Sequence, residues 1–226
     1  MEKCSQNASE PIGLTPADQA RIKDLYESRL VTHGTDVKTV GWNSTSDQHM
    51  RFEVLCRGLD LRGKRILDIG CGLGDFVPWA EGKFGPDFDY LGMDLSEGLV
   101  KVARSRFESP RRQFVADTLS SKIHSESFDI AVLSGTLTFK TSDNLATMGS
   151  LLENAWRVSK EAVCCNFMTK YCDFQLEKNY HYSPEDVFRH AKSFSQFVNL
   201  IHDYELYEFT IQIFHAAAVK RQKRKQ

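Results

Sequence analysis

From residue 64 onward, short apolar segments typical of strands alternate with longer segments typical of helices. Parallel strands need a crossover of about a dozen residues or more, usually a helix, and such crossovers are right-handed. The alternation therefore predicts a mostly parallel sheet covered by helices. The expected strands are 64–70, 88–94, 112–118, 128–135 and 161–169, and the expected helices among them are 74–84, 97–107, 144–159 and 182–194.

The pattern changes after residue 194. Residues 197–215 have the composition of two strands joined by a few residues, and so short a connection requires an antiparallel pair. Ahead of the sheet, residues 15–30 and 46–59 have apolar side chains at helical spacing. We therefore expect an α/β three-layer sandwich. Its seven-stranded, mostly parallel sheet ends in an antiparallel C-terminal hairpin, and the N-terminal helices form a lid.

The charge balance argues against a surface built for duplex nucleic acid. The net charge is −1 and the isoelectric point is about 6.7, whereas such surfaces have a strong basic excess. Basic residues cluster only in residues 219–226, which indicate either a solvated tail or a contact for RNA or an anionic surface. No apolar run reaches the roughly 18 residues that span a bilayer, and no secretory signal is evident.

The six cysteines have no spacing typical of a metal site. We expect free thiols in a reducing cytoplasm and no bound metal. The adjacent Cys164 and Cys165 lie in an expected strand, so their side chains should point to opposite faces.

Directly after the first expected strand, the stretch ILDIGCGLGDF places Gly70, Gly72 and Gly74 within five residues. A phosphate-binding P-loop needs a lysine after its last glycine, and none follows here. A dinucleotide fingerprint would place its third glycine where Asp75 stands. Asp68 ends the strand, and its carboxylate would repel a pyrophosphate but suit a ligand that carries an ammonium group.

The segment Asp68-Ile-Gly-Cys-Gly-Leu-Gly74 resembles the first motif of class I S-adenosylmethionine-dependent methyltransferases, and the resemblance covers roughly residues 60–215. The chain resembles bacterial methyltransferase-domain proteins whose acceptor is unassigned. The resemblance implies S-adenosylmethionine as cofactor, S-adenosylhomocysteine as product and a Rossmann-like sheet. It divides the chain into a helical lid at 1–59, the methyltransferase domain at 60–217 and a basic tail at 218–226.

The resemblance also implies roles for residues at the ends of the later strands. Asp94 would bind the ribose hydroxyls, Leu95 would pack on the adenine, and Asp117 would accept from the adenine amino group. Arg51 is either a partner of the cofactor carboxylate or a solvated helix residue, and Trp42 is either a lid ring or a core anchor. The expected cofactor set is Asp68, Gly70, Cys71, Gly72, Gly74, Asp94, Leu95, Asp117, Thr118, Ser134, Gly135, Arg51 and Trp42.

Acceptor contacts are expected from the long polar and aromatic segment 169–188, which follows the fifth expected strand. His181 is the candidate catalytic base because histidine titrates near neutral pH, although a surface role fits the sequence equally well. His202 and Asp203 are an alternative, and they also fit a hairpin turn. The expected substrate-binding residues are Tyr26, Tyr171, Tyr180 and Tyr182.

The predicted function is transfer of a methyl group from S-adenosylmethionine to an oxygen or nitrogen of a small-molecule acceptor. Enzymes that methylate exocyclic amines of nucleic acids resemble one another in a [DN]PP[YFW] motif, and the equivalent stretch here is SGTLTF. Cytosine-C5 methyltransferases need a nucleophilic cysteine, whereas Cys164 and Cys165 lie in an expected buried strand and are interpreted as structural. A nucleic-acid (RNA) methyltransferase and a non-catalytic S-adenosylmethionine-binding scaffold remain the alternatives.

Overall fold

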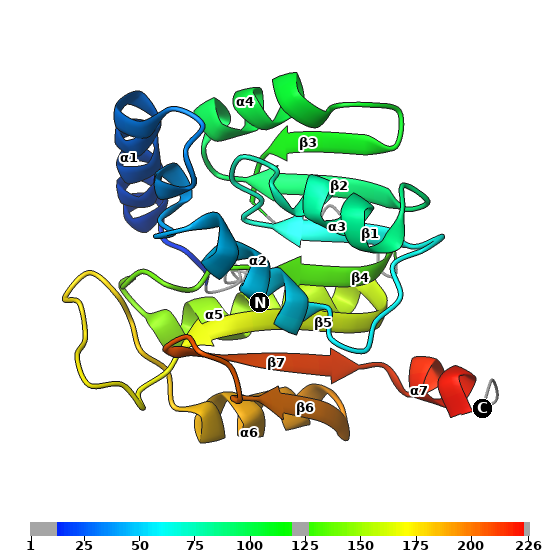
Figure 1. Cartoon of the computed structure of the whole chain (residues 1–226). Coiled ribbons are helices and arrows are strands. Elements are labelled where there is room, and N and C mark those ends of the chain that lie inside the picture. Colours follow the sequence, from blue (N-terminus) through cyan, green and yellow to red (C-terminus); the bar gives the residue numbers. More distant parts are fainter. Residues whose placement is uncertain (1–12, 119–126, 224–226) are drawn as a thin grey trace, which may run out of the picture.

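The structure, a computed structural model, describes residues 13–118 and 127–223. Its strands form one sheet in the order β3-β2-β1-β4-β5-β7-β6 (Figure 1). The pairs formed among β1 to β5 are parallel, and β7 is antiparallel to both β5 and β6, which confirms the expected hairpin. The strands are β1 Arg65–Ile69, β2 Asp89–Asp94, β3 Arg112–Ala116, β4 Phe128–Leu133, β5 Ser159–Met168, β6 Phe197–Ile201 and β7 Glu208–Phe214.

Helices cover both faces of this sheet, and the sheet separates the apolar core into two clusters. One cluster of buried side chains joins the sheet to α5 and α6, and the other joins it to α2, α3 and α4. Cys165 belongs to the first cluster and Cys164 to the second, as expected for neighbours on a strand. The helices are α1 Pro16–His33, η1 Val37–Val40, α2 Thr45–Leu55, α3 Phe76–Phe84, α4 Glu97–Phe107, α5 Asn144–Val158, α6 Pro184–Phe194 and α7 Ala216–Lys223.

Several helices begin at a residue whose side chain accepts a backbone hydrogen bond. The Thr15 hydroxyl accepts from the amide of Asp18, and Pro16 occupies the first turn of α1. Such caps satisfy donors that the first helical turn leaves free. The side chains of Ser44, Ser96, Asp143 and Ser183 cap α2, α4, α5 and α6 in the same way.

The N-terminal elements lie beside the carboxyl ends of the parallel strands (Figure 1). Helix α1 contacts η1 and α4. The Glu27 carboxylate of α1 accepts from Ser96 Oγ at 2.7 Å and from the Gly98 amide at 3.1 Å, which fixes α1 to the start of α4. The strand order reverses between β1 and β4, so this edge is where an open α/β sheet binds ligands.

The C-terminal segment differs in part from the solvated tail that its charges suggested. Residues 216–223 form α7, which packs against β5, and Ala218 is buried. The expected tail therefore begins inside a packed helix, and its last three residues lie outside the described part. Of the cysteines, five are described and carry free thiols, while Cys4 lies outside the described residues. None of the described helices is long and apolar enough to cross a membrane.

Candidate functional site

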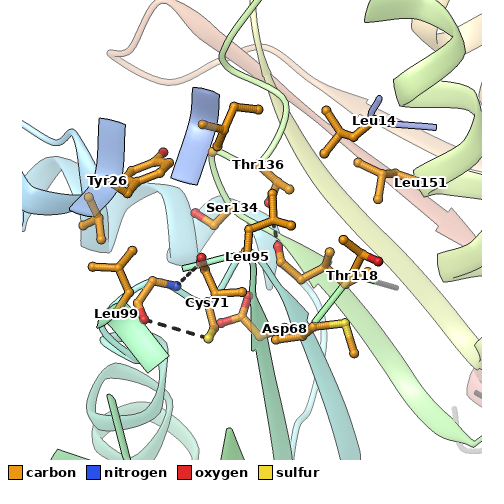
Figure 2. A pocket seen from close by; sticks show the side chains of 18 of the residues that line it. Leu14, Tyr26, Asp68, Cys71, Leu95, Leu99, Thr118, Ser134, Thr136 and Leu151 are labelled. Carbon is orange, nitrogen blue, oxygen red and sulfur yellow. Dashed lines mark hydrogen bonds between the residues drawn. The ribbon is translucent and has the colours of Figure 1, made fainter. Parts of the chain in front are cut away.

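A cavity of about 530 Å³ opens at the carboxyl ends of the strands (Figure 2). One wall consists of the turn after β1 together with the residues that follow β2, β3 and β4. Helix α5 contributes Ser150, Leu151 and Asn154, and the N-terminal elements contribute Gln19, Ile22, Tyr26, Val40 and Trp42. The volume lies within the usual range for sites that bind small molecules.

The turn after β1 closes tightly over the end of β2. The amides of Gly70 and Cys71 both donate to the carbonyl of Met93, at 2.7 and 3.0 Å. Gly72 has a φ of 54°, and a Cβ built there would lie 2.7 Å from Val40 Cγ1. Glycine is therefore required at Gly72 both by its backbone conformation and by the close approach of η1.

Asp94 ends β2 and is held by backbone donors on both carboxylate oxygens. The Gly72 amide donates to Oδ2 and the Ser96 amide donates to Oδ1, each at 2.9 Å. Burial raises the pKa of Asp94, and these hydrogen bonds act against that rise. Each carboxylate oxygen has two acceptor positions, so the side chain can still accept from hydroxyl groups in the cavity.

Asp68 lies at the end of β1 and lines the same cavity, although only 3 % of its surface is exposed. The Tyr90 hydroxyl donates to its Oδ2 at 2.7 Å. Burial raises the pKa of Asp68 to about 7, the negative charge of Asp94 adds to the rise, and the Tyr90 hydrogen bond opposes it. A cationic group bound beside Asp68 would favour its ionised form.

The segment after β4 forms the cavity floor on the other side of β1 from Asp94. Ser134 Oγ is buried and has no hydrogen-bond partner, so a ligand in the cavity could satisfy it. Thr136 Oγ1 donates to the carbonyl of Ile69 at 2.6 Å, and the Gly135 amide donates to Asn166 Oδ1 at 2.7 Å. The glycine backbone, the two carboxylates and the unsatisfied hydroxyl fit a ligand that has both a nucleoside ribose and an amino-acid group.

Comparison with known proteins agrees with this geometry. A family profile described as "Methyltransferase domain" matches residues 66–162. A provisionally named methyltransferase of Mycobacterium tuberculosis is 31% identical over 159 residues, which cover 67% of this chain and 93% of that protein. A demethylmenaquinone methyltransferase of Lactococcus lactis is 24% identical over 126 residues, 53% of this chain and 48% of that protein.

Solved structures share the fold. The magnesium protoporphyrin IX methyltransferase of Synechocystis with bound S-adenosylhomocysteine has a TM-score of 0.64 at 13% identity, over 88% of this chain and 100% of that chain. The same enzyme with bound S-adenosylmethionine also has a TM-score of 0.64, at 14% identity over 88% and 97%. The fold is thus the Rossmann-like methyltransferase fold. With the sequence relatives, it shows that the chain belongs to the class I S-adenosylmethionine-dependent methyltransferases.

Most of the expected cofactor residues line the cavity, together with one expected acceptor residue, Tyr26. They come from six separate segments that the fold brings to one place, and Figure 2 shows several of them around the same space. The lining members are Tyr26, Trp42, Asp68, Gly70, Cys71, Gly72, Asp94, Leu95, Asp117, Thr118, Ser134 and Gly135.

Arg51 requires a correction, because it does not face the cavity. Its Nε and Nη2 donate to the Glu208 carboxylate at 2.7 to 3.0 Å, and its Nη1 donates to the Asp47 carbonyl at 2.8 Å. Gly74 also lies outside the lining. Its φ is 78°, and a Cβ there would lie 2.9 Å from the Phe114 ring, so its role is packing.

The expected acceptor residues of the segment after β5 also lie outside the cavity lining. Tyr182 is buried in the core shared with α5 and α6, where its ring meets Phe167, and Tyr180 packs against that core. Tyr171 is 63 % exposed and its hydroxyl donates to Glu185. The positions of these tyrosines in the sequence did not indicate which rings would be buried against the sheet.

His181, the expected base, is buried away from the cavity lining. Its Nδ1 lies 2.8 Å from the Thr169 carbonyl, a contact that requires a proton on Nδ1, and the Cys172 sulfur lies 3.5 Å from the same nitrogen. Its Nε2 is buried without a partner. The ring is thereby fixed to the backbone beyond β5, and this geometry does not favour a base role at the cavity.

Several lining residues were not among those expected from the sequence. Thr136 directly follows Ser134 and Gly135, so position alone was a signal for it. Leu99 was open to the same argument because it lies one turn beyond Asp94 and Leu95. The contributions of Leu151 and Asn154 had no local signal, since only the packing of α5 places them at the cavity.

Proposed function

We propose that the chain transfers the methyl group of S-adenosylmethionine to an oxygen or nitrogen of a small-molecule acceptor bound beneath α1. The observation that carries this proposal is the extent of the cavity. It runs from the motif carboxylates past the strand ends to a wall of aromatic and apolar side chains, which includes Tyr26, Trp42 and Phe139. A cofactor and an acceptor can therefore meet in one cavity.

In this proposal the motif residues bind and orient the cofactor. Asp94 accepts from the ribose hydroxyls, Asp68 faces the amino group, and Ser134 Oγ gains the partner it lacks. Leu95 packs against the adenine, and Asp117 with Thr118 contacts its edge. When bound, the cofactor supplies a methyl group on a sulfonium, which is already a good leaving group.

The chain's contribution to transfer is then mainly alignment and exclusion of water. Helix α1 and η1 cover the cavity, and Tyr26, which lines it, can hold a hydroxyl or ring of the acceptor. Burial raises the pKa of Tyr26 well above its ordinary range, so its phenol is a hydrogen-bond donor near neutral pH. In this proposal residues 1–59, of which 13–59 are described, act as the lid, and residues 60–217 form the catalytic domain of a cytoplasmic enzyme.

The acidic and basic groups around the cavity also bear on the acceptor. Within the described lining, the ionisable side chains are Tyr26, Cys71 and three aspartates, and no histidine or lysine is present. We therefore favour an acceptor whose attacking atom has an available lone pair or ionises readily. The names of the Lactococcus lactis and Synechocystis proteins, a demethylmenaquinone and a magnesium protoporphyrin methyltransferase, are in line with small-molecule chemistry.

Calorimetric titration with S-adenosylmethionine and then with S-adenosylhomocysteine tests cofactor binding. Incubation with methyl-labelled cofactor and a metabolite extract, in parallel with an RNA extract, tests the acceptor. Label in a small organic compound supports the proposal. Label in RNA replaces it with the nucleic-acid alternative, and binding without any transfer favours a scaffold.

A further inference from the structure

A chain of buried polar contacts lies behind the cavity wall, on the sheet face that α2 covers. Glu208 begins β7, Asn166 lies near the end of β5, and Arg51 comes from α2; the exposed fractions are 4 %, 2 % and 8 %. On one side, the Glu208 carboxylate accepts hydrogen bonds from Nε and Nη2 of Arg51. On the other side its Oε2 accepts from Asn166 Nδ2 at 2.5 Å.

The two ends of this chain meet at one residue of the cavity floor. Asn166 Oδ1 accepts from the Gly135 amide at 2.7 Å. The Arg51 guanidinium lies 3.9 Å from the centre of the Trp42 ring, and the edge of that ring lies over Gly135, where a Cβ would come within 2.5 Å of it. The contacts thus form a closed ring that runs Glu208, Arg51, Trp42, Gly135, Asn166 and back to Glu208.

Two members of this ring, Trp42 and Gly135, line the cavity, while the other three do not. A buried carboxylate and guanidinium are costly to desolvate, and the pair is strongly destabilising if only one partner is removed. A fully satisfied buried network, by contrast, can specify a single arrangement of the groups that it joins. The ring fixes both the backbone of the Ser134–Gly135 turn and the plane of the Trp42 indole.

We propose that Glu208 is a positioning residue of the methyltransferase site, which acts through Arg51 and Asn166 to hold Trp42 and the Ser134–Gly135 turn against the bound cofactor. The inference rests on the proposed cofactor site. It also gives Arg51 a different role from the one its sequence position suggested. Arg51 orients the wall and does not contact the ligand.

The arrangement offers a rescue experiment because amide and carboxylate can be exchanged. Glu208→Gln leaves Arg51 without a counter-charge, and Asn166→Asp places a second carboxylate beside Glu208. In the double variant Asn166→Asp/Glu208→Gln, the carboxylate at position 166 replaces the Asn166 amide oxygen as acceptor of the Gly135 amide. The amide at position 208 donates to that carboxylate, and one negative charge remains near Arg51. Both single variants should bind S-adenosylmethionine about tenfold more weakly, and the double variant should recover most of that loss.

Two further measurements report on the ring without the cofactor. Trp42 fluorescence, isolated by comparison with Trp42→Phe, should shift to longer wavelength in the single variants. Hydrogen exchange at the Gly135 amide should accelerate in them, and both signals should return in the double variant. The matched control is Glu81→Gln, which disturbs the pair of Glu81 with the buried Arg112 and lies outside the cavity lining. It should lower stability while affinity stays unchanged.

Single variants with unchanged affinity, emission and exchange would overturn the inference. A double variant no better than either single would overturn it as well, because the residues would then act independently. If the parent chain itself fails to bind S-adenosylmethionine, the proposed function fails. In that case the emission and exchange measurements still decide whether the ring holds the turn.

Discussion

Asp94 Oδ2 accepts a hydrogen bond from the Gly72 amide at 2.9 Å, which ties the end of β2 to the glycine turn after β1. The carboxylate that accepts this bond is expected to bind ribose. The turn that it holds is expected to surround the amino-acid part of the ligand. The two halves of the proposed cofactor site are therefore built as one unit. A change at either residue should affect the other.

Substitution of Asp94 is the most direct test of that unit. Asp94→Ala removes the acceptor of two backbone amides and of the proposed ribose hydroxyls, so affinity for S-adenosylmethionine should fall by ~1–3 kcal/mol. Calorimetric titration measures the loss. The control is Asp89→Ala, since Asp89 begins the same strand at the opposite edge and pairs with Arg111. Equal affinity for S-adenosylmethionine in both variants would show that Asp94 does not bind the cofactor.

Asp68 should make stability depend on pH. Its pKa is raised from 3.8 to about 7, so between these values the native state keeps a proton that the unfolded state releases. That contribution to the free energy of unfolding is complete below the lower value and is lost as pH rises through about 7. Each unit of pKa difference corresponds to about 1.4 kcal/mol.

The variant Asp68→Asn keeps an acceptor for Tyr90 but cannot ionise. Its free energy of unfolding relative to the parent should therefore rise between about pH 3.8 and about pH 7, by up to roughly 4 kcal/mol. Urea denaturation at several pH values measures the difference. Asp60→Asn is an opposite control, because the Arg62 hydrogen bond lowers the pKa of the exposed Asp60 to about 2. A pH-independent difference at position 68 would contradict the prediction.

The sequence predicted those parts of the fold that depend on local pattern. The alternation after residue 64 and the short connection before β7 were sufficient for the sheet, because crossover length and chirality limit the topologies. The side chains that were misplaced depend on partners far along the chain. Arg51 meets Glu208 from 157 residues away, and nothing near Arg51 indicates that partner.

Distant partners also explain why the places of the tyrosines and His181 were not predicted from the sequence. Which of them are buried depends on how the segment after β5 folds back onto the sheet. There the Tyr182 amide donates to the Met168 carbonyl at 2.8 Å and brings Tyr182 into the core. Motif glycines and aspartates were easier to place because strand ends in a parallel sheet meet at one edge.

Glycine at position 72 should be required for more than its conformation. Gly72→Ala adds a Cβ at a φ of 54° and within 2.7 Å of Val40 Cγ1, while Gly63→Ala adds one at a φ of 68° with nothing within 4 Å. Both variants should lose about 1–2 kcal/mol of stability from the left-handed backbone. Only Gly72→Ala should also weaken S-adenosylmethionine binding. Equal affinity in the two variants would show that the contact with η1 does not shape the site.

Glu27 should control how firmly α1 covers the cavity. Its carboxylate accepts from Ser96 Oγ and the Gly98 amide at the start of α4, where a negative charge is favoured by the helix dipole. Glu27→Ala should therefore cost about 0.5–2 kcal/mol, the range for loss of a capping group. Hydrogen exchange across residues 16–33 should accelerate by more than the change in global stability accounts for. The matched variant Asp24→Ala removes an exposed acid from the same helix and should leave that exchange unchanged. If both variants accelerate exchange equally, general destabilisation of α1 explains the effect, and the contact with α4 does not hold α1 over the cavity.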